Sequence, residues 1–211
     1  MKGMTSVLFV ALSTVFATVA NASPMLYLDR ATFESAITID QTVDFESAFP
    51  FAQNSIAFGD LTFNSTDGTG IHRTASGSFG GTSTRLAAQN SGGIRIDVAG
   101  SFNALGMEVG ELFRGLSTGT FTLFDTSSNV IASHVMDVGY FGPSPSYIGW
   151  ISDVAIGGFL FTVTGSNDFE TIDNVVLGNG STGGAVPEPA SLALLGLGLL
   201  VGARRRHAAG A

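Results

Sequence analysis

The chain has 211 residues, of which 45% are hydrophobic and 12% charged, and its formal net charge is −8. Such an acidic chain lacks the basic face that nucleic-acid binders need for phosphate, and its mean hydropathy of +0.36 is too high for a disordered protein. We therefore expect one ordinary globular domain with attached segments, and no nucleic-acid partner.

The N-terminal segment has the composition of a secretory signal peptide. Lys2 is followed by an apolar stretch over residues 7–20, and the small residues Ala20 and Ala22 follow at the spacing that signal peptidase requires. We expect residues 1–22 to be removed during export through the inner membrane, which leaves Ser23 as the first mature residue.

The exported part is more acidic than the whole chain. Residues 23–186 contain five Arg, no Lys and sixteen Asp or Glu, so that their net charge is −11. The chain has no cysteine, and its stability therefore depends on a core of Phe, Ile, Val and Leu rather than on disulfides. A surface of this charge favours solvation or divalent cations over anionic ligands.

The first predicted element of the mature chain is one short helix. Asp29 is suited to cap a helix from about Arg30 to Ile37, in which Phe33 and Ile37 share one apolar face.

After this helix the pattern becomes that of short β-strands. Runs of β-branched and aromatic residues, many of them alternating apolar with polar, are separated by Gly, Ser, Asn and Asp clusters. These runs cover residues 42–46, 56–64, 85–89, 93–99, 104–110, 119–125, 130–135, 148–156, 158–164 and 171–177. Because no helices alternate with the strands, we predict an all-β fold over residues 23–178, an antiparallel β-sandwich of the jelly-roll type.

The C-terminal part begins with a Gly/Ser/Thr linker over residues 179–185. Pro187, Glu188 and Pro189 follow, then an apolar run to Ala203, and then Arg204, Arg205 and Arg206. Fourteen apolar residues are few for a membrane-spanning helix, which usually takes about 20. The three arginines would hold the chain end on the cytoplasmic side.

This arrangement over residues 186–211 resembles the PEP-CTERM sorting signal of exopolysaccharide-producing Gram-negative bacteria. The resemblance implies a short transmembrane sorting helix and processing near the Pro-Glu-Pro tripeptide by an exosortase, a membrane-embedded cysteine protease. The alternative is that the apolar run is a permanent anchor, although so short a span would be under hydrophobic mismatch.

The body is similar to the jelly-roll domains that commonly precede such tails. The resemblance lies in short motifs at residues 43–46, 104–110, 148–154 and 172–175. It supports the predicted fold and says little about activity.

Three acidic residues form a candidate structural calcium site. Asp44 and Glu46 are two residues apart on one predicted strand, so their side chains should share a face while Phe45 points into the core. The first and last strands of jelly rolls commonly lie together, which would bring Asp173 to the same place and create an oxygen-rich site. The alternative is that these carboxylates are solvated charges at a strand edge.

An aromatic loop forms a candidate sugar-binding rim. Tyr140, Phe141, Tyr147 and Trp150 surround a Gly-Pro-Ser-Pro segment, and flat aromatic faces suit the apolar side of a sugar ring. Because the body is acidic, a neutral exopolysaccharide is the expected partner. A core role for Trp150 is the alternative.

No catalytic signature is present in the sequence. There is no cysteine and no nucleophile-elbow serine, and neither His72 nor His134 lies in a recognisable motif. We therefore expect a non-enzymatic, exported protein, anchored transiently in the inner membrane and then placed in the cell envelope or extracellular matrix. Two alternatives are a carbohydrate-binding module and a secreted glycoside hydrolase.

Overall fold

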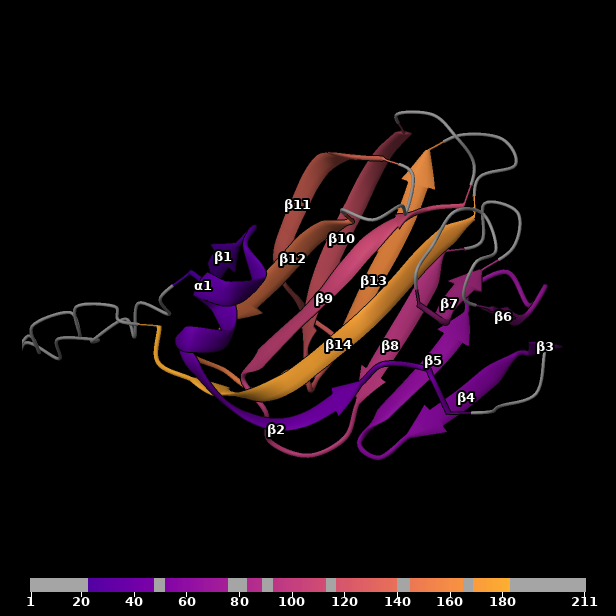
Figure 1. Ribbon diagram of the computed structural model, residues 1–211. Helices are drawn as coiled ribbons and strands as arrows, with labels where there is room; N and C mark the ends of the chain where they lie inside the picture. The colour runs from indigo at the N-terminus through magenta and orange to yellow at the C-terminus, as the bar shows by residue number, and fades with distance from the viewer. Residues whose placement is uncertain are drawn as a thin grey trace, which may run out of the picture. The chain divides into compact units, whose positions relative to one another are not determined.

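A computed structural model describes residues 23–47, 52–75, 83–88, 93–112, 117–139, 145–164 and 169–182. Most of these residues lie in strands, which form two antiparallel sheets (Figure 1). The predicted all-β sandwich is thus confirmed. The predicted signal peptide and sorting tail, with Ala20, Ala22 and residues 186–211, lie outside the described residues.

The first sheet has eight strands, all paired antiparallel. Its order is β1 (Met25–Tyr27), β12 (Ser146–Ile151), β9 (Ala104–Glu111), β14 (Glu170–Gly180), β7 (Arg85–Ala88), β6 (Ile71–Thr74) and β3 (Ala52–Gln53), with β2 (Ile37–Val43) also pairing with β14.

The second sheet has six strands. Its order is β11 (Val130–Val138), β10 (Ser117–Asp125), β13 (Ile156–Thr164), β8 (Ile94–Val98), β5 (Leu61–Ser65) and β4 (Ser55–Phe58). The loop after Asp125 joins β10 to β11, and the Asp125 carboxylate accepts hydrogen bonds from the backbone N–H groups of Ser127 and Asn129.

The core lies between the two sheets and contains the residues that the alternating pattern points inward. Ile94 and Ile96 of β8 are fully buried, and so are Phe121 and Leu123 of β10. The rings of Phe121 and Phe161 stack with centroids 4.6 Å apart. Burial of these side chains is the main favourable contribution to folding.

The one helix among the described residues, α1 (Arg30–Ser35), covers part of the outer face of the first sheet. Asp29 caps it as predicted, because its side chain accepts the backbone N–H of Thr32 at 2.8 Å. Phe33 is the buried residue of the helix. The helix is shorter than predicted, since Ala36 forms its C-cap and Ile37 begins β2.

Glycines in two neighbouring strands make room for this helix. A Cβ on Gly106 of β9 would lie 2.7 Å from the Phe33 ring, and one on Gly149 of β12 would lie 2.8 Å from it. The helix therefore lies against a part of the sheet where a larger residue would collide with Phe33.

Two expected strands proved to be interrupted. The run over residues 56–64 is a hairpin of β4 and β5 that turns at Gly59 and Asp60, and the run over 148–156 breaks after Ile151, where the chain leaves β12 of the first sheet for β13 of the second. The last strand continues to Gly180, two residues beyond the expected domain end.

Within the described ranges, no helix is both long enough and apolar enough to cross a membrane.

Candidate functional site

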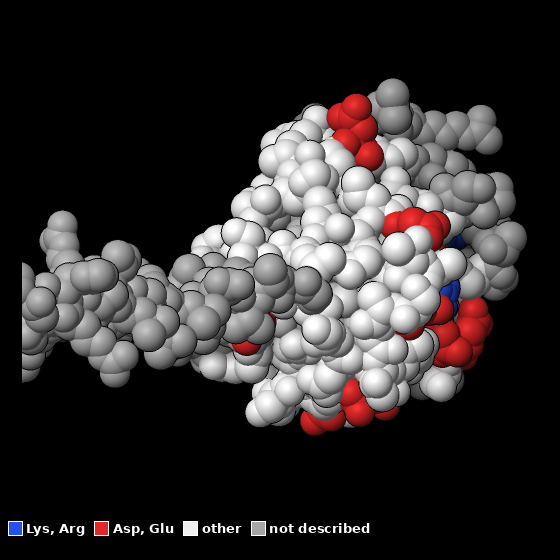
Figure 2. Space-filling model, turned by 90° about the vertical axis from the view of Figure 1, so that its left-hand side faces the viewer, with Lys and Arg blue, Asp and Glu red and all other residues white. Residues whose placement is uncertain are grey.

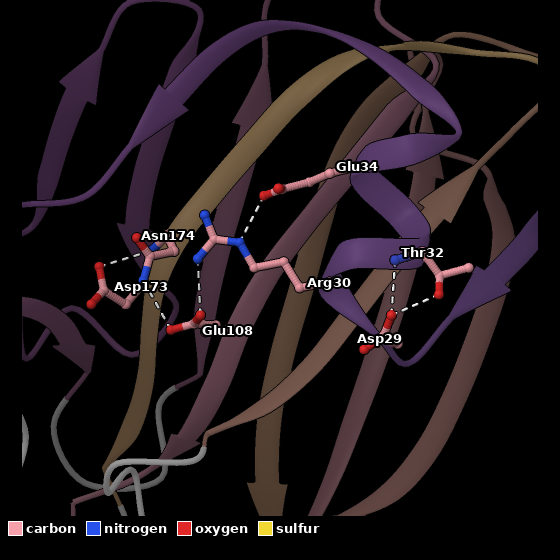
Figure 3. Close-up of polar contacts among 7 residues, drawn as sticks. All are labelled: Asp29, Arg30, Thr32, Glu34, Glu108, Asp173 and Asn174. Carbon is pink, nitrogen blue, oxygen red and sulfur yellow. Dashed lines mark hydrogen bonds and ion pairs between the residues drawn. The ribbon is translucent and has the colours of Figure 1, made fainter.

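A chain of polar contacts runs over the outer face of the first sheet, from α1 across β9 to β14 (Figure 3). Met107 and Val109 of β9 point into the core, so Glu108 between them points outward. In the pairing of β9 with β14, Glu108 lies directly opposite Asp173. The fold thus places two carboxylates side by side, which repel each other unless other groups compensate.

Arg30 supplies the basic group of this chain of contacts. Its Nε donates to Glu34 at 2.7 Å, and its Nη1 donates to Glu108 at 3.0 Å. The first pair is an i, i+4 contact within α1, and the second fastens the helix to β9. Two carboxylates hold the guanidinium in place.

A bulge in β14 brings in the next group. The register of β14 against β9 shifts between Asp173 and Val176, and Asn174 adopts the left-handed conformation with φ 48°, which asparagine tolerates better than most residues. The Asn174 side chain then donates to Glu108 at 2.9 Å, while its backbone N–H donates to Asp173 at 2.8 Å. Bulges often re-aim side chains near functional sites.

Asp173 is fully buried at the far end of the contacts. Its Oδ2 accepts a hydrogen bond of 2.5 Å from the Ser83 hydroxyl. Burial raises the pKa of the Asp173 carboxyl to about 6, and the negative charges of Glu108 and Glu46 act in the same direction. We call Arg30, Glu34, Glu108, Asp173, Asn174 and Ser83 the outer-face network.

The predicted calcium ligands come together only in part. Strand β2 pairs with β14, as expected for first and last strands. Glu46 therefore lies close enough to Asp173 for its negative charge to raise the pKa of Asp173. The Glu46 carboxylate accepts the Thr84 backbone N–H at 2.8 Å. Asp44 is exposed and accepts the backbone N–H of Glu46.

The expected geometry of Asp44 and Glu46 is wrong. Strand β2 ends at Val43, and Phe45 has φ 55°, so these two acids do not share a strand face. Phe45 does point into the core, as predicted. Among the described residues, no three His, Asp or Glu side chains are placed to hold one metal ion. Calcium binding stays a prediction.

The structure describes two of the four predicted sugar-binding aromatics, and both are buried. Tyr140 and Phe141 lie outside the described residues. Trp150 is 2% exposed and packs against Phe159 in the core, which is the alternative role that its sequence position allowed. Tyr147 is also buried, with its ring 5.8 Å from that of Phe33 beneath α1.

Tyr147 nevertheless lines a pocket of about 390 Å³ beside the start of α1. We call it the α1 pocket, and its wall includes Leu28, Asp29, Arg30, Glu108, Ser146 and Tyr147. The Tyr147 hydroxyl is buried without a hydrogen-bond partner in the described structure. Burial raises the pKa of this hydroxyl, and the nearby charge of Glu34 adds to the effect.

Sequence reasoning missed Arg30, Glu108 and Asn174. The spacing of Arg30 and Glu34 was a signal for an ion pair, and Glu108 between two apolar strand residues was a signal for an outward carboxylate. No pattern along the chain shows that Glu108 and Asp173 are direct partners.

Comparison with solved structures gives only distant likenesses. The CBM22-1 xylan-binding domain of Paenibacillus barcinonensis Xyn10C is 13% identical with a TM-score of 0.42, and the match covers 69% of this chain and 98% of that domain. The CBM22-1–GH10 modules of Clostridium thermocellum xylanase 10B, solved with xylohexaose, are 14% identical with a TM-score of 0.40. That match covers 67% of this chain but only 28% of the xylanase chain.

A third likeness is to the enzymatically active domain of tailspike protein 4 from bacteriophage CBA120. It is 12% identical with a TM-score of 0.30, and the match covers 77% of this chain and 20% of that one. No curated protein matches the sequence.

The C-terminal segment gives a direct result. Residues 185–206 match the family model of the PEP-CTERM protein-sorting motif, over the segment in which the sequence contains Pro187-Glu188-Pro189, the apolar run and the arginines. This motif implies export and transient membrane anchoring before processing. The chain therefore carries a PEP-CTERM protein-sorting motif behind a β-sandwich body.

Proposed function

We propose that the chain is a non-enzymatic protein of the cell envelope or extracellular matrix, which an exosortase sorts and processes and which associates with exopolysaccharide. The match of residues 185–206 to the sorting motif carries this proposal. The signal-peptide pattern at the other end supports it, because a sorted protein must first be exported.

The order of residues in the tail suits a membrane protease. The three arginines keep the chain end cytoplasmic while the body is outside, so Pro187, Glu188 and Pro189 come to the outer interface. Proline lacks the backbone N–H that a helix needs and restricts the residue before it, so the apolar helix begins beyond the tripeptide. The protease thus meets non-helical backbone at a fixed depth.

Fractionation of producing cells tests the proposal. We expect the wild-type protein in the envelope and extracellular fractions, and a variant with Pro187→Ala and Pro189→Ala in the inner membrane. A matched control with Pro50→Ala and Pro143→Ala, in the body, should be sorted like the wild type. Equal distribution of the tail variant and the wild type would contradict sorting through this motif.

A carbohydrate-binding module is the second candidate function for the body. The α1 pocket favours it, since convergent polar groups beside exposed apolar surface are typical of small-ligand sites. Sorting and binding are compatible, because they use different parts of the chain.

A further inference from the structure

The α1 pocket lies where one edge of the first sheet is uncovered. Strand β1 pairs with only three residues of β12, and the last of these pairs is Tyr27 of β1 with Gly149 of β12. After Tyr27 the chain leaves the sheet and forms α1. In the described part of the structure, no strand therefore pairs with the outer edge of β12 at Ser146 and Tyr147. A partner in the pocket can therefore reach both side chains and strand backbone.

The pocket contains groups that accept and groups that donate hydrogen bonds. Asp29 uses Oδ1 to accept from the backbone and hydroxyl of Thr32, and its Oδ2 has no partner within the described residues. Arg30 donates through Nε to Glu34 and through Nη1 to Glu108. Its Nη2 has no hydrogen-bond partner among the described residues. A hydroxyl group both donates and accepts, so it can use both kinds of group.

The wall of the pocket also has an apolar side. Leu28 is 55% exposed, and among the large apolar side chains of the described residues only Val130 and Val135, both in β11, are more exposed.

 The ring of Tyr147 lines the same pocket. Because Tyr147 is only 7% exposed, the Leu28 side chain is the group that would contact the apolar C–H face of a pyranose, whose hydroxyl groups then point to the polar side.

The charges near the pocket disfavour an ionic ligand. Asp29 and Glu108 outnumber Arg30 in the wall, and the whole exported part is acidic, so an anionic sugar would be repelled. Figure 2 shows acidic side chains on one face of the body with little basic surface beside them. A cationic sugar would meet the Arg30 guanidinium, which its two ion pairs hold in place.

We propose that the α1 pocket binds a neutral pyranose unit of a polysaccharide. The inference rests on the proposed association with exopolysaccharide and names the site and the ligand class for it. The ion pairs of Arg30 fix the polar side of the pocket before the ligand arrives, which lowers the entropy cost of binding.

Affinity electrophoresis of the purified exported protein tests this inference. The probes are gels that contain a soluble β-glucan, a galactomannan or a dextran as neutral polymers, alginate as an anionic polymer, and no polymer as a blank. We expect retardation in at least one neutral gel and none in alginate. Leu28→Ser, which removes the exposed apolar side chain of the wall, and Glu108→Gln, which removes one of the two ion pairs that hold Arg30, should each weaken binding about tenfold or more.

Val130→Ser is the matched control for Leu28→Ser, because it removes a similarly exposed aliphatic side chain outside the pocket. It should bind like the wild type, and thermal melting should show all variants folded. Should Glu108→Gln fail to fold, Leu28→Ser alone decides. No retardation in any neutral gel, retardation in alginate, or unchanged binding by Leu28→Ser would overturn the inference. A protein that is sorted normally but not retarded would leave the proposed sorting intact.

Discussion

Asp173 is the residue of the outer-face network whose protonation most affects the fold. Its pKa in the folded protein is about 6, against an ordinary value of 3.8, and burial is the main cause. The folded state therefore holds this proton more tightly than the unfolded chain. The resulting stabilisation is complete below about pH 3.8 and is lost as the pH rises through 6.

We predict that Asp173→Asn removes this pH dependence. In the presence of a chelator, the wild type should lose about 2 kcal/mol of unfolding free energy from this residue between pH 4 and pH 7.5, at roughly 1.4 kcal/mol per pKa unit with a discount for screening. Asparagine keeps the shape and can still accept from Asn174. Urea denaturation at several pH values measures the effect, and an equal pH slope in the variant and the wild type would contradict it.

Calcium provides a second test of the same residue. If a divalent cation binds beside Glu46 and Asp173, it must displace the proton of Asp173, so binding should strengthen above pH 6. We predict that saturating calcium raises the melting midpoint at pH 7.5 and raises it less at pH 5. A hundredfold excess over Kd corresponds to about 2.7 kcal/mol.

Asp173→Asn is the control for this measurement, because it removes one of the two charges. Its midpoint should respond little to calcium. No response of the wild type, or an equal response of the two proteins, would mean that the protein's own donors satisfy these carboxylates without a metal.

At the scale of elements, α1 depends on Phe33. This fully buried side chain packs against the rings of Tyr27 and Tyr147 and against Gly106 and Gly149. We predict that Phe33→Ala lowers the unfolding free energy by about 3 kcal/mol, the usual cost of such a cavity, and that Phe33→Leu costs less. Urea denaturation measures both. A loss below about 1 kcal/mol in the alanine variant would show that the helix contributes little to the fold.

The elements also show what the sequence can predict. Strands with clear alternation, such as β8 and β10, lie within two residues of the expected ranges, because one buried face imposes the pattern on each strand. β6 was missed because the two residues between Ile71 and Thr74 are His72 and Arg73, which do not have the composition of a strand. The turn at Gly59 and Asp60 was hidden between two apolar runs.

The candidate site was less predictable for a physical reason. The contact of Glu108 with Asn174 depends on the register of β9 with β14 and on a bulge at one residue. Both result from packing over the whole sheet rather than from the residues near the site. The pairing of β2 with β14 was expected from the fold class, so the approach of Glu46 to Asp173 could be predicted, but the end of β2 at Val43 could not.

At the scale of the molecule, the body ends in a strand that is fastened to it. Asn103 donates to the carbonyl of Gly180 at 2.9 Å and accepts the N–H of the same residue at 2.8 Å. The body is thus secured up to the start of the linker, and cleavage near the tripeptide would leave its sheets unchanged. We therefore expect sorting to depend on the tail and folding to depend on the body.

Intact mass spectrometry of the exported protein is the most direct test of sorting through the tail. In cells that contain the exosortase, we predict a chain that begins at Ser23 and ends near Pro187-Glu188-Pro189. In cells without the protease, the chain should keep its C-terminus, and the variant with Pro187→Ala and Pro189→Ala should keep it in both. A wild-type protein that still ends at Ala211 in the presence of the protease would contradict the account.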